Sequence, residues 1–215
     1  MNQSDKQFAL EIVDWGLVDY EEAYARQKRA VAEVQGGGPQ KIFLCEHPAV
    51  LTLGRMARKE YILCPADELA RAGVKVLFVD RGGEVTLHAP GQLVVYPILD
   101  LRNYGQDLRK YLYKLEQVGI DLLNGFDILT NRFSGRTGIW FGAKKIASIG
   151  VGVKKWVAYH GLGLNVNTDL RLFDWIRPCG LAVEMTSMAQ ILGAAVKMAD
   201  VKVKMTEHLH RHFSL

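Results

Sequence analysis

The longest amphipathic patterns in the chain predict two helices, over residues 19–35 and 106–123. In each of them, apolar side chains recur at spacings of three and four residues, which places them along one face of a helix. Asp19 is a typical N-cap residue for the first helix, and the glycines at positions 36–38 end its pattern. We therefore expect both helices to pack one apolar face against a core.

Shorter apolar segments between glycine and proline turns predict strands. These segments cover residues 8–13, 41–45, 74–80, 84–88, 92–98, 138–141, 145–153 and 157–166. Short helices are expected over residues 66–72, 170–176 and 187–192, with a last helix near the C-terminus. Strands and helices follow one another without a regular βαβ repeat, which predicts an α+β fold with a mixed β-sheet and flanking helices.

Length and composition favour one domain over residues 1–215. The chain has 215 residues, of which 49% are hydrophobic and 23% charged, as in ordinary globular proteins. Disorder, collagen and coiled coil are excluded as its main description. No apolar run approaches the roughly 18 residues that a membrane helix needs, and the N-terminus lacks the pattern of a signal peptide. We therefore expect a cytoplasmic protein that does not bind membranes.

Charge and cysteine content restrict the choice of partners. The net charge is only +4 and the basic residues are scattered, which argues against nucleic acid as a partner. Cys45, Cys64 and Cys179 are too few and too dispersed for a disulfide framework or a zinc site. Free thiols are expected, one of which is a candidate for reactivity.

Neither a metal nor a nucleotide cofactor is expected. His208, His210 and His212 lie close together near the C-terminus, but only the first and last share a helix face, so a solvated helix end is favoured over a metal site. The chain contains no phosphate-binding GxxxxGK[ST] loop, and Gly161-Leu162-Gly163 lacks the third glycine of a dinucleotide site.

The segment over residues 81–92 is a candidate ligand-binding region. Its last four residues, beginning at Ala89, fit a type II turn with proline second and glycine third. Gly82 and Gly83 permit a close approach of the backbone to a ligand, and Arg81 and His88 flank them. Two ordinary hairpin turns are the structural alternative, and the pattern alone does not decide between them.

Two further segments carry candidate nucleophile chemistry. Lys145 opens an otherwise apolar strand, either as a solvated lysine or as a partly desolvated amine with a lowered pKa. Cys179 lies between proline and glycine, where neighbouring amides could form an oxyanion hole, although a buried structural cysteine is the commoner case. Cys45 and Cys64 fit the structural role better.

Together these segments resemble the lipoyl(octanoyl) transferases, the octanoyl-[acyl-carrier-protein]:protein N-octanoyltransferase family. The similarity covers about two thirds of the chain, from about residue 44 to residue 187. Its five ordered motifs are CEHPAVLTLGR (45–55), RGGEVTLHAPGQLVVYPILDLR (81–102), GRTGIWFGAKKIASIGVGV (135–153), HGLGLNVNTDL (160–170) and IRPCGLAVEMTS (176–187).

The resemblance implies the fold of biotin and lipoate protein ligases, and a Cys179 thioester with Lys145 as its dyad partner. It implies octanoyl-acyl carrier protein as donor, and as acceptors the lipoyl domains of 2-oxoacid dehydrogenase complexes and the glycine cleavage H protein. It also assigns acyl-group binding to three stretches. They contain Arg81, Gly82, Gly83, Glu84, Val85, Thr86, Leu87 and His88; Ser148, Ile149 and Gly150; and Gly161, Leu162 and Gly163.

Two residues depart from the family pattern. Ala89 stands where the family usually has glycine, and Gly163 stands where it usually has alanine. The methyl group of Ala89 is expected to crowd the pocket if the backbone there needs a positive φ, whereas Gly163 makes room. Neither residue belongs to the dyad, so acyl chain length is the property that we expect to change.

The chemistry of the residues agrees with this resemblance. A thiolate suits an acyl thioester donor, and a neighbouring lysine can take the thiol proton or stabilise the thiolate. Transfer from thioester to amide is downhill and needs no ATP. Strand alternation suggests Ile149, Leu162 and Leu164 as walls of the acyl slot. Three lysines are candidates for contacts with an acidic carrier protein. The alternative is that they are ordinary solvated side chains. They are Lys144, Lys154 and Lys155.

Two other classes of function stay open. An ATP-dependent lipoate or biotin ligase of the same fold would need a loop that holds an adenylate, which the sequence does not show. A binding module without catalysis would not need Cys179 and Lys145 in matching motifs.

Overall fold

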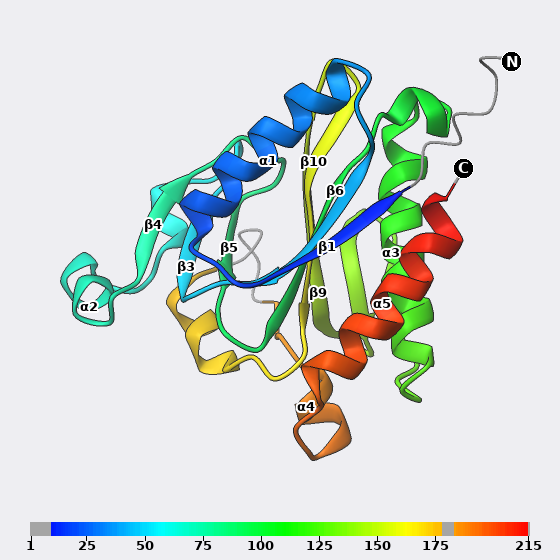
Figure 1. Ribbon diagram of the computed structural model, residues 1–215. Helices are drawn as coiled ribbons and strands as arrows, with labels where there is room; N and C mark the ends of the chain where they lie inside the picture. Colours follow the sequence, from blue (N-terminus) through cyan, green and yellow to red (C-terminus); the bar gives the residue numbers. More distant parts are fainter. Residues whose placement is uncertain (1–9, 178–182, 215) are drawn as a thin grey trace, which may run out of the picture.

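A computed structural model describes residues 10–177 and 183–214. In this part of the chain a seven-stranded sheet has the strand order β1-β2-β6-β10-β9-β8-β7 (Figure 1). The strands are β1 (Glu11–Leu17), β2 (Lys41–Glu46), β6 (Gln92–Ile98), β10 (Val157–Asn165), β9 (Lys144–Lys154), β8 (Arg136–Phe141) and β7 (Asn131–Phe133). Strands β1 and β2 are parallel and the other neighbours are antiparallel. The predicted mixed sheet is therefore confirmed.

A second sheet of three strands lies beside α1 in Figure 1. Its order is β4 (Lys75–Phe78), β3 (Val50–Leu53) and β5 (Val85–His88). Strand β3 is parallel to β4 and antiparallel to β5. All four residues of β3 are buried, so this strand shows no alternation of polar and apolar side chains, and the sequence pattern did not predict it. The short edge strand β7 was also not predicted.

Helices cover both faces of the large sheet, as Figure 1 shows. Helix α1 (Tyr20–Gln35) packs on one face, and α3 (Leu108–Asn124) with α5 (Met198–Phe213) packs on the other. Alternation along the central strands explains the two cores, because Leu93 and Val95 face α3 and α5 whereas Val94 and Tyr96 face α1. The two long predicted helices are thus confirmed with nearly the expected bounds.

Aspartate side chains cap the N-terminal ends of both long helices, and the cap at Asp19 was predicted. The side chain of Asp19 accepts a hydrogen bond from the amide of Glu21 at the start of α1, and Asp107 does the same for Arg109 at the start of α3. The predicted type II turn is present, since Gly91 has a φ of +82° and the amide of Gln92 donates to the carbonyl of Ala89 at 3.1 Å.

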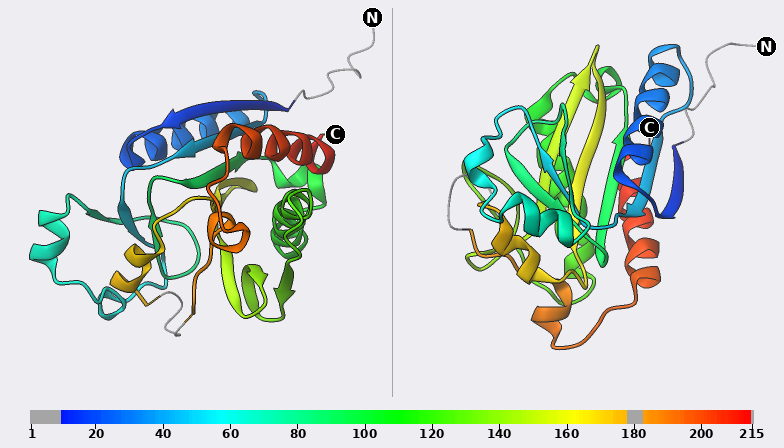
Figure 2. Two further views of the ribbon diagram at one scale, coloured as in Figure 1. Left: turned by 90° about the horizontal axis from the view of Figure 1, so that it is seen from below. Right: turned by 90° about the vertical axis from the view of Figure 1, so that its left-hand side faces the viewer.

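Short helical segments complete the described chain. They are α2 (Ala66–Arg71), α4 (Met188–Leu192) and the 3-10 turns η1 (Lys59–Tyr61), η2 (Leu101–Tyr104) and η3 (Leu170–Trp175). The two views of Figure 2 show α2 and η3 on the side of the three-stranded sheet, and α4 beyond the end of the large sheet. Among the described residues, no helix has both the length and the apolar character that crossing a membrane requires.

Candidate functional site

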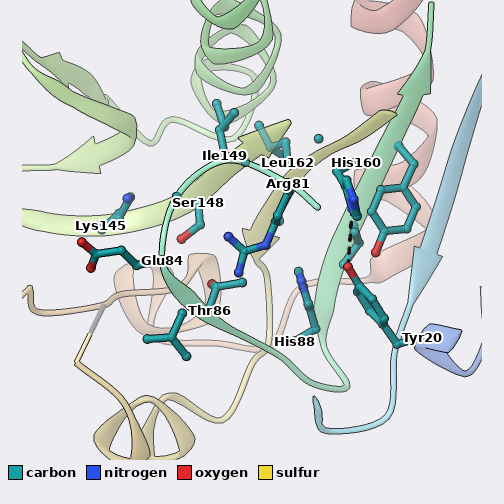
Figure 3. A pocket seen from close by; sticks show the side chains of 17 residues that line it. Tyr20, Arg81, Glu84, Thr86, His88, Lys145, Ser148, Ile149, His160 and Leu162 are labelled. Carbon is teal, nitrogen blue, oxygen red and sulfur yellow. Dashed lines mark hydrogen bonds between the residues drawn. The ribbon is translucent and has the colours of Figure 1, made fainter. Parts of the chain in front are cut away.

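A pocket lies where β5 of the small sheet faces β9 and β10 of the large sheet (Figure 3). About 590 Å³ of space not filled by protein atoms, part of it open to solvent, lies among its lining residues. Glycines of β9 and β10 are part of its wall, and they permit a close approach of neighbouring groups such as the Arg81 side chain and the backbone of Val95. The pocket is lined by Tyr20, Arg81, Gly83, Glu84, Val85, Thr86, His88, Val94, Tyr96, Lys145, Ser148, Ile149, Gly150, His160, Gly161, Leu162 and Gly163.

The three stretches assigned from the sequence to acyl binding converge on this pocket. Every residue of those stretches lines it except Gly82 and Leu87. The Leu87 side chain is buried in the core of the small sheet. Gly82 instead fastens its loop to β9, where its amide donates to the carbonyl of Val151 at 2.8 Å.

Four lining residues were not predicted. Tyr20 comes from the start of α1, and Val94 and Tyr96 come from the centre of β6, so only tertiary packing brings them here. His160 is the fourth, and it opens the same motif that contains Gly161 and Gly163. Its position beside those glycines is the one signal in the sequence that could have identified it.

Arg81 crosses the pocket as a buried side chain. Its Nη2 atom donates to the carbonyl oxygen of Thr52 at 2.7 Å, and its Nη1 donates to that of Gly82 at 3.0 Å. Two glycines make room for it. A Cβ atom at Gly54 would lie 2.8 Å from Nη1, and one at Gly150 would lie 3.1 Å from the Arg81 Cδ. These glycines therefore determine where the guanidinium sits.

Lys145 lies near the start of β9 and reaches the pocket although it is buried. Its ammonium nitrogen is 5.3 Å from the centre of the Trp140 ring, a cation–π distance. Gly138 on the neighbouring strand has no side chain, and a Cβ there would lie 2.4 Å from the Lys145 Cε. The lysine stem therefore occupies space that this glycine leaves open.

The backbone of Lys145 is paired with the segment that follows residue 183. Its amide donates to the carbonyl of Glu184 at 2.8 Å, and its carbonyl accepts from the amide of Thr186 at 2.9 Å. Cys179 itself lies outside the described residues, so its predicted pairing with Lys145 stays a prediction. On the other side of the cysteine in the chain, the Arg177 amide donates to the carbonyl of Tyr61 at 2.8 Å.

Neutral aromatic and histidine rings form the end of the pocket away from Lys145 (Figure 3). Tyr20 stacks on His88 with ring centres 5.5 Å apart, and His47 lies behind both rings at 5.2 Å and 5.7 Å. Burial lowers the pKa of His88 to about 3 and that of His47 to about 4. Both imidazoles are therefore uncharged near neutral pH, as suits an apolar ligand.

Asp80 holds His160 at the edge of this cluster. The carboxylate of Asp80 accepts hydrogen bonds from Tyr24 at 2.6 Å, Tyr159 at 2.8 Å and His160 Nε2 at 3.1 Å, and Lys28 lies 3.2 Å away. Burial opposes its ionisation, but these bonds hold the pKa of Asp80 well below its usual range. His160 has a φ of +57°, which breaks the alternation of β10 and lets two consecutive side chains reach one carboxylate.

The bond to Asp80 also determines the proton position on His160. Nε2 must carry the hydrogen that it donates to the carboxylate, so Nδ1 is an acceptor and faces the hydroxyl of Tyr20 at 3.5 Å. Burial lowers the pKa of His160 despite the neighbouring carboxylate. The ring is thus neutral and oriented.

The two departures from the family pattern have different structural consequences. Ala89 is buried in the core of the small sheet, and it is not among the described residues with a positive φ. Its methyl group is therefore not forced into the pocket. Gly163 does line the pocket, and a Cβ there would lie 3.0 Å from Gln92 Oε1 and 3.7 Å from His88 Cε1.

Several other expectations can be compared with the structure. Ile149 and Leu162 line the pocket, but Leu164 lies in the core under α3 and α5, so its expected place in the acyl slot is wrong. Lys144 pairs with Glu184 near one end of β9, whereas Lys154 ends that strand and Lys155 follows it. With about 3.3 Å per residue along a strand, these lysines do not border one pocket mouth.

The remaining thiols and histidines lie outside the pocket. Cys45 and Cys64 are both buried, and burial raises the pKa of Cys45. His212 Nε2 lies 2.7 Å from an oxygen of Asp121, which fastens α5 to α3. Within residues 10–177 and 183–214, no group of three histidine, cysteine or acidic side chains is arranged to hold a metal ion.

Comparison with known proteins identifies relatives over nearly the whole chain. Residues 19–210 match the family described as Lipoyl protein ligase A/B catalytic domain. An octanoyltransferase from Solibacter usitatus is 45% identical over 199 residues, which are 92% of this chain and 90% of that protein.

Solved structures of low identity share the fold. Lipoate-protein ligase A bound with ATP has a TM-score of 0.72 at 14% identity, over 96% of this chain and 85% of that one. Biotin protein ligase from Aquifex aeolicus has a TM-score of 0.53 at 14% identity, over 95% of this chain and 69% of that one. These likenesses confirm the predicted fold class.

Proposed function

The chain belongs to the lipoyl protein ligase A/B catalytic domain family, and on this basis we propose that it is an octanoyltransferase of lipoate biosynthesis. In this proposal it takes an octanoyl or lipoyl group from acyl carrier protein and transfers it to a specific lysine of a lipoyl domain. Cys179 carries the acyl group as a thioester, and Lys145 is its partner. The high identity to a curated octanoyltransferase supports this choice of activity.

The observation that carries the proposal is the convergence of three separate stretches and Lys145 on one pocket. Branched apolar side chains such as Val94, Ile149 and Leu162, together with neutral rings, suit a hydrocarbon chain. Burying an eight-carbon chain contributes on the order of 5 kcal/mol at about 0.8 kcal/mol per methylene. The lysine at one end of the pocket suits the reacting thioester.

The first half of the reaction acylates the cysteine. The Sγ atom of Cys179 attacks the donor carbonyl carbon, the new C–S bond forms, and the bond to the carrier thiol breaks. Lys145 takes the proton of the Cys179 thiol and returns it to the departing carrier thiolate. The Trp140 ring beside its side chain and the backbone pairing with Glu184 hold the lysine for this role.

The second half delivers the acyl group to the acceptor. The lysine amine of the lipoyl domain attacks the thioester carbon, the C–N bond forms, and the C–S bond to Cys179 breaks. The nitrogen loses a proton and the sulfur leaves as a thiolate that is protonated again. Because the donor thioester already supplies the driving force, the proposed reaction needs no ATP.

The donor and acceptor belong to the same proposal. The donor is octanoyl-acyl carrier protein, and the acceptors are the lipoyl domains of 2-oxoacid dehydrogenase complexes and the glycine cleavage H protein. We further propose that residues 1–215 form one catalytic domain and that the protein works in the cytoplasm.

The experiment that tests the proposal follows the acyl group by mass. Mixing the protein with octanoyl-acyl carrier protein should add one octanoyl group, in the absence of ATP and with magnesium chelated. The adduct should disappear in Cys179→Ala and persist in Cys45→Ser and Cys64→Ser. Adding a lipoyl domain should move the group to one lysine.

Two outcomes would contradict the proposal. An adduct that persists on Cys179→Ala would exclude this nucleophile. Acceptor modification that requires ATP and free octanoate would instead favour the ligase activity of the structural relatives.

A further inference from the structure

Glu84 places a carboxylate on the wall of the pocket. The residue precedes β5, and its carbonyl accepts a hydrogen bond from the amide of Gly54 at 2.9 Å, so its backbone is anchored. Its side chain lines the pocket. Figure 3 shows it at the same end as Lys145, away from Tyr20 and His160.

One oxygen of this carboxylate lacks a partner. Oε2 of Glu84 is buried from solvent, and no donor within residues 10–177 and 183–214 makes a hydrogen bond to it. In the same part of the chain no ion pair joins Glu84 to a cationic side chain, whereas the nearby Lys144 is paired with Glu184. A buried carboxylate oxygen without a hydrogen bond is costly. Such an oxygen is satisfied by ordered water or by a hydrogen-bond donor of a bound ligand.

The chemistry of the two substrates decides which ligand this is. The thioester donor presents an apolar chain and a neutral carbonyl to the pocket, and neither can donate a hydrogen bond. The acceptor brings a lysine ammonium, with three N–H donors and a positive charge. Glu84 is the acidic member of the lining set, and the lining histidines His88 and His160 are neutral and lie at the other end.

We infer that Glu84 binds the ε-ammonium group of the acceptor lysine and guides it to the acyl-enzyme. This inference rests on the proposed octanoyl transfer and adds a positioning residue for its second half. One proton of the ammonium is released to solvent before attack. The second leaves the nitrogen as the C–N bond forms and the C–S bond breaks, and it goes to the sulfur of Cys179. Glu84 accepts a hydrogen bond from a remaining N–H of the same nitrogen.

The experiment separates the two half-reactions. Acyl-enzyme prepared from octanoyl-acyl carrier protein is mixed either with a lipoyl domain or with hydroxylamine, a nucleophile that is neutral at pH 7. In Glu84→Gln the transfer to the lipoyl-domain lysine should become at least tenfold slower, with a higher KM for the lipoyl domain. The rate of self-acylation and the rate of release by hydroxylamine should fall several-fold less than the lysine transfer, because neither step binds the lysine ammonium.

Two further variants complete the test. Glu84→Asp keeps the charge and should restore a large part of the lysine transfer. Glu60→Gln removes an exposed carboxylate that pairs with Arg58 outside the pocket, and it should behave as wild type. Unchanged lysine transfer in Glu84→Gln would overturn the inference, and so would an equal loss toward both nucleophiles. Failure of the wild-type protein to form an acyl-enzyme would overturn the proposed function instead.

Discussion

The backbone amide of Lys145 donates to the carbonyl oxygen of Glu184 at 2.8 Å. This bond joins the start of strand β9 to Glu184, which follows Cys179 by five residues in the sequence. A lysine in a flexible loop would lose this fixed position. This pairing brings the motif of Lys145 next to the segment that follows the proposed nucleophile, and it gives the first prediction its structural basis.

Replacing Lys145 should remove most of the acyl transfer. Lys145→Ala is expected to slow the acylation of Cys179 by about a hundredfold or more, because the group that takes the thiol proton is lost. Lys145→Arg should not restore activity, since a guanidinium stays protonated near neutral pH. Single-turnover acylation, followed by mass, measures both rates.

The adjacent Lys144 is the matched control for this prediction. It is partly exposed and paired with Glu184, so Lys144→Ala should retain at least half of the wild-type rate. Equal losses in Lys144→Ala and Lys145→Ala would mean that neither lysine has a specific role.

Enlarging residue 163 should shorten the preferred acyl chain. Gly163→Ala would place a methyl group 3.0 Å from Gln92 Oε1. That amide cannot easily move, because it is hydrogen-bonded to His88 and Asn165. We expect the ratio of kcat/KM for decanoyl over hexanoyl donors to fall about tenfold. Gly36→Ala lies at the end of α1 with an ordinary φ, and it should leave the ratio unchanged.

The buried histidines should make the protein less stable in mild acid. An unfolded histidine takes up a proton near pH 6.5, but His47 in the folded protein does so near pH 4 and His88 near pH 3. The stability that these two neutral histidines give to the folded protein is therefore complete well above pH 6.5. It is lost progressively as the pH falls below 6.5. From pH 7 to pH 5, each should remove about 2 kcal/mol from the free energy of unfolding.

Urea unfolding at these two pH values tests the prediction. The difference in the free energy of unfolding between pH 7 and pH 5 should be about 2 kcal/mol smaller in His47→Gln than in the wild type. His210 is exposed on α5, so His210→Gln should show the wild-type difference. If the free energy of unfolding depended on pH in the same way in wild type and His47→Gln, protonation of His47 would not be a cause of the loss of stability.

Neutralising Asp80 should weaken the contact between α1, the small sheet and β10. In Asp80→Asn the hydrogen bonds from Tyr24, Tyr159 and His160 lose a charged acceptor, so the free energy of unfolding at pH 7 should fall by about 2 kcal/mol. The carboxylate is about one third exposed, which keeps the effect modest. Because the pKa of Asp80 is lowered, the effect should be complete above about pH 3.8 and should decline gradually as the pH falls further below it.

Asp67→Asn is the control for this loss of charge. Asp67 forms an exposed ion pair with Arg71 within α2, so its replacement should change the free energy of unfolding by less than about 0.5 kcal/mol. A similar effect of both aspartate variants would show that Asp80 has no special structural role.

Sequence patterns alone were enough to predict the fold class, the two long helices and most strands, because these depend on local periodicity, caps and turn residues. Helix α1 and strand β6 are clear examples, the latter found with its exact bounds. The sequence also determined the family and the stretches around Arg81, Ser148 and Gly161, because contiguous motifs carry them.

Contacts between residues that are far apart in the sequence could be found only in the tertiary structure. Strand β3 is buried along its whole length and therefore shows no alternation of polar and apolar residues that would predict a strand. The approach of Tyr20, from α1, to His88 and His160, and the unpartnered oxygen of Glu84, arise from the packing of two sheets and a helix. Local patterns specify which side chains face a core, but not which distant side chains they meet there.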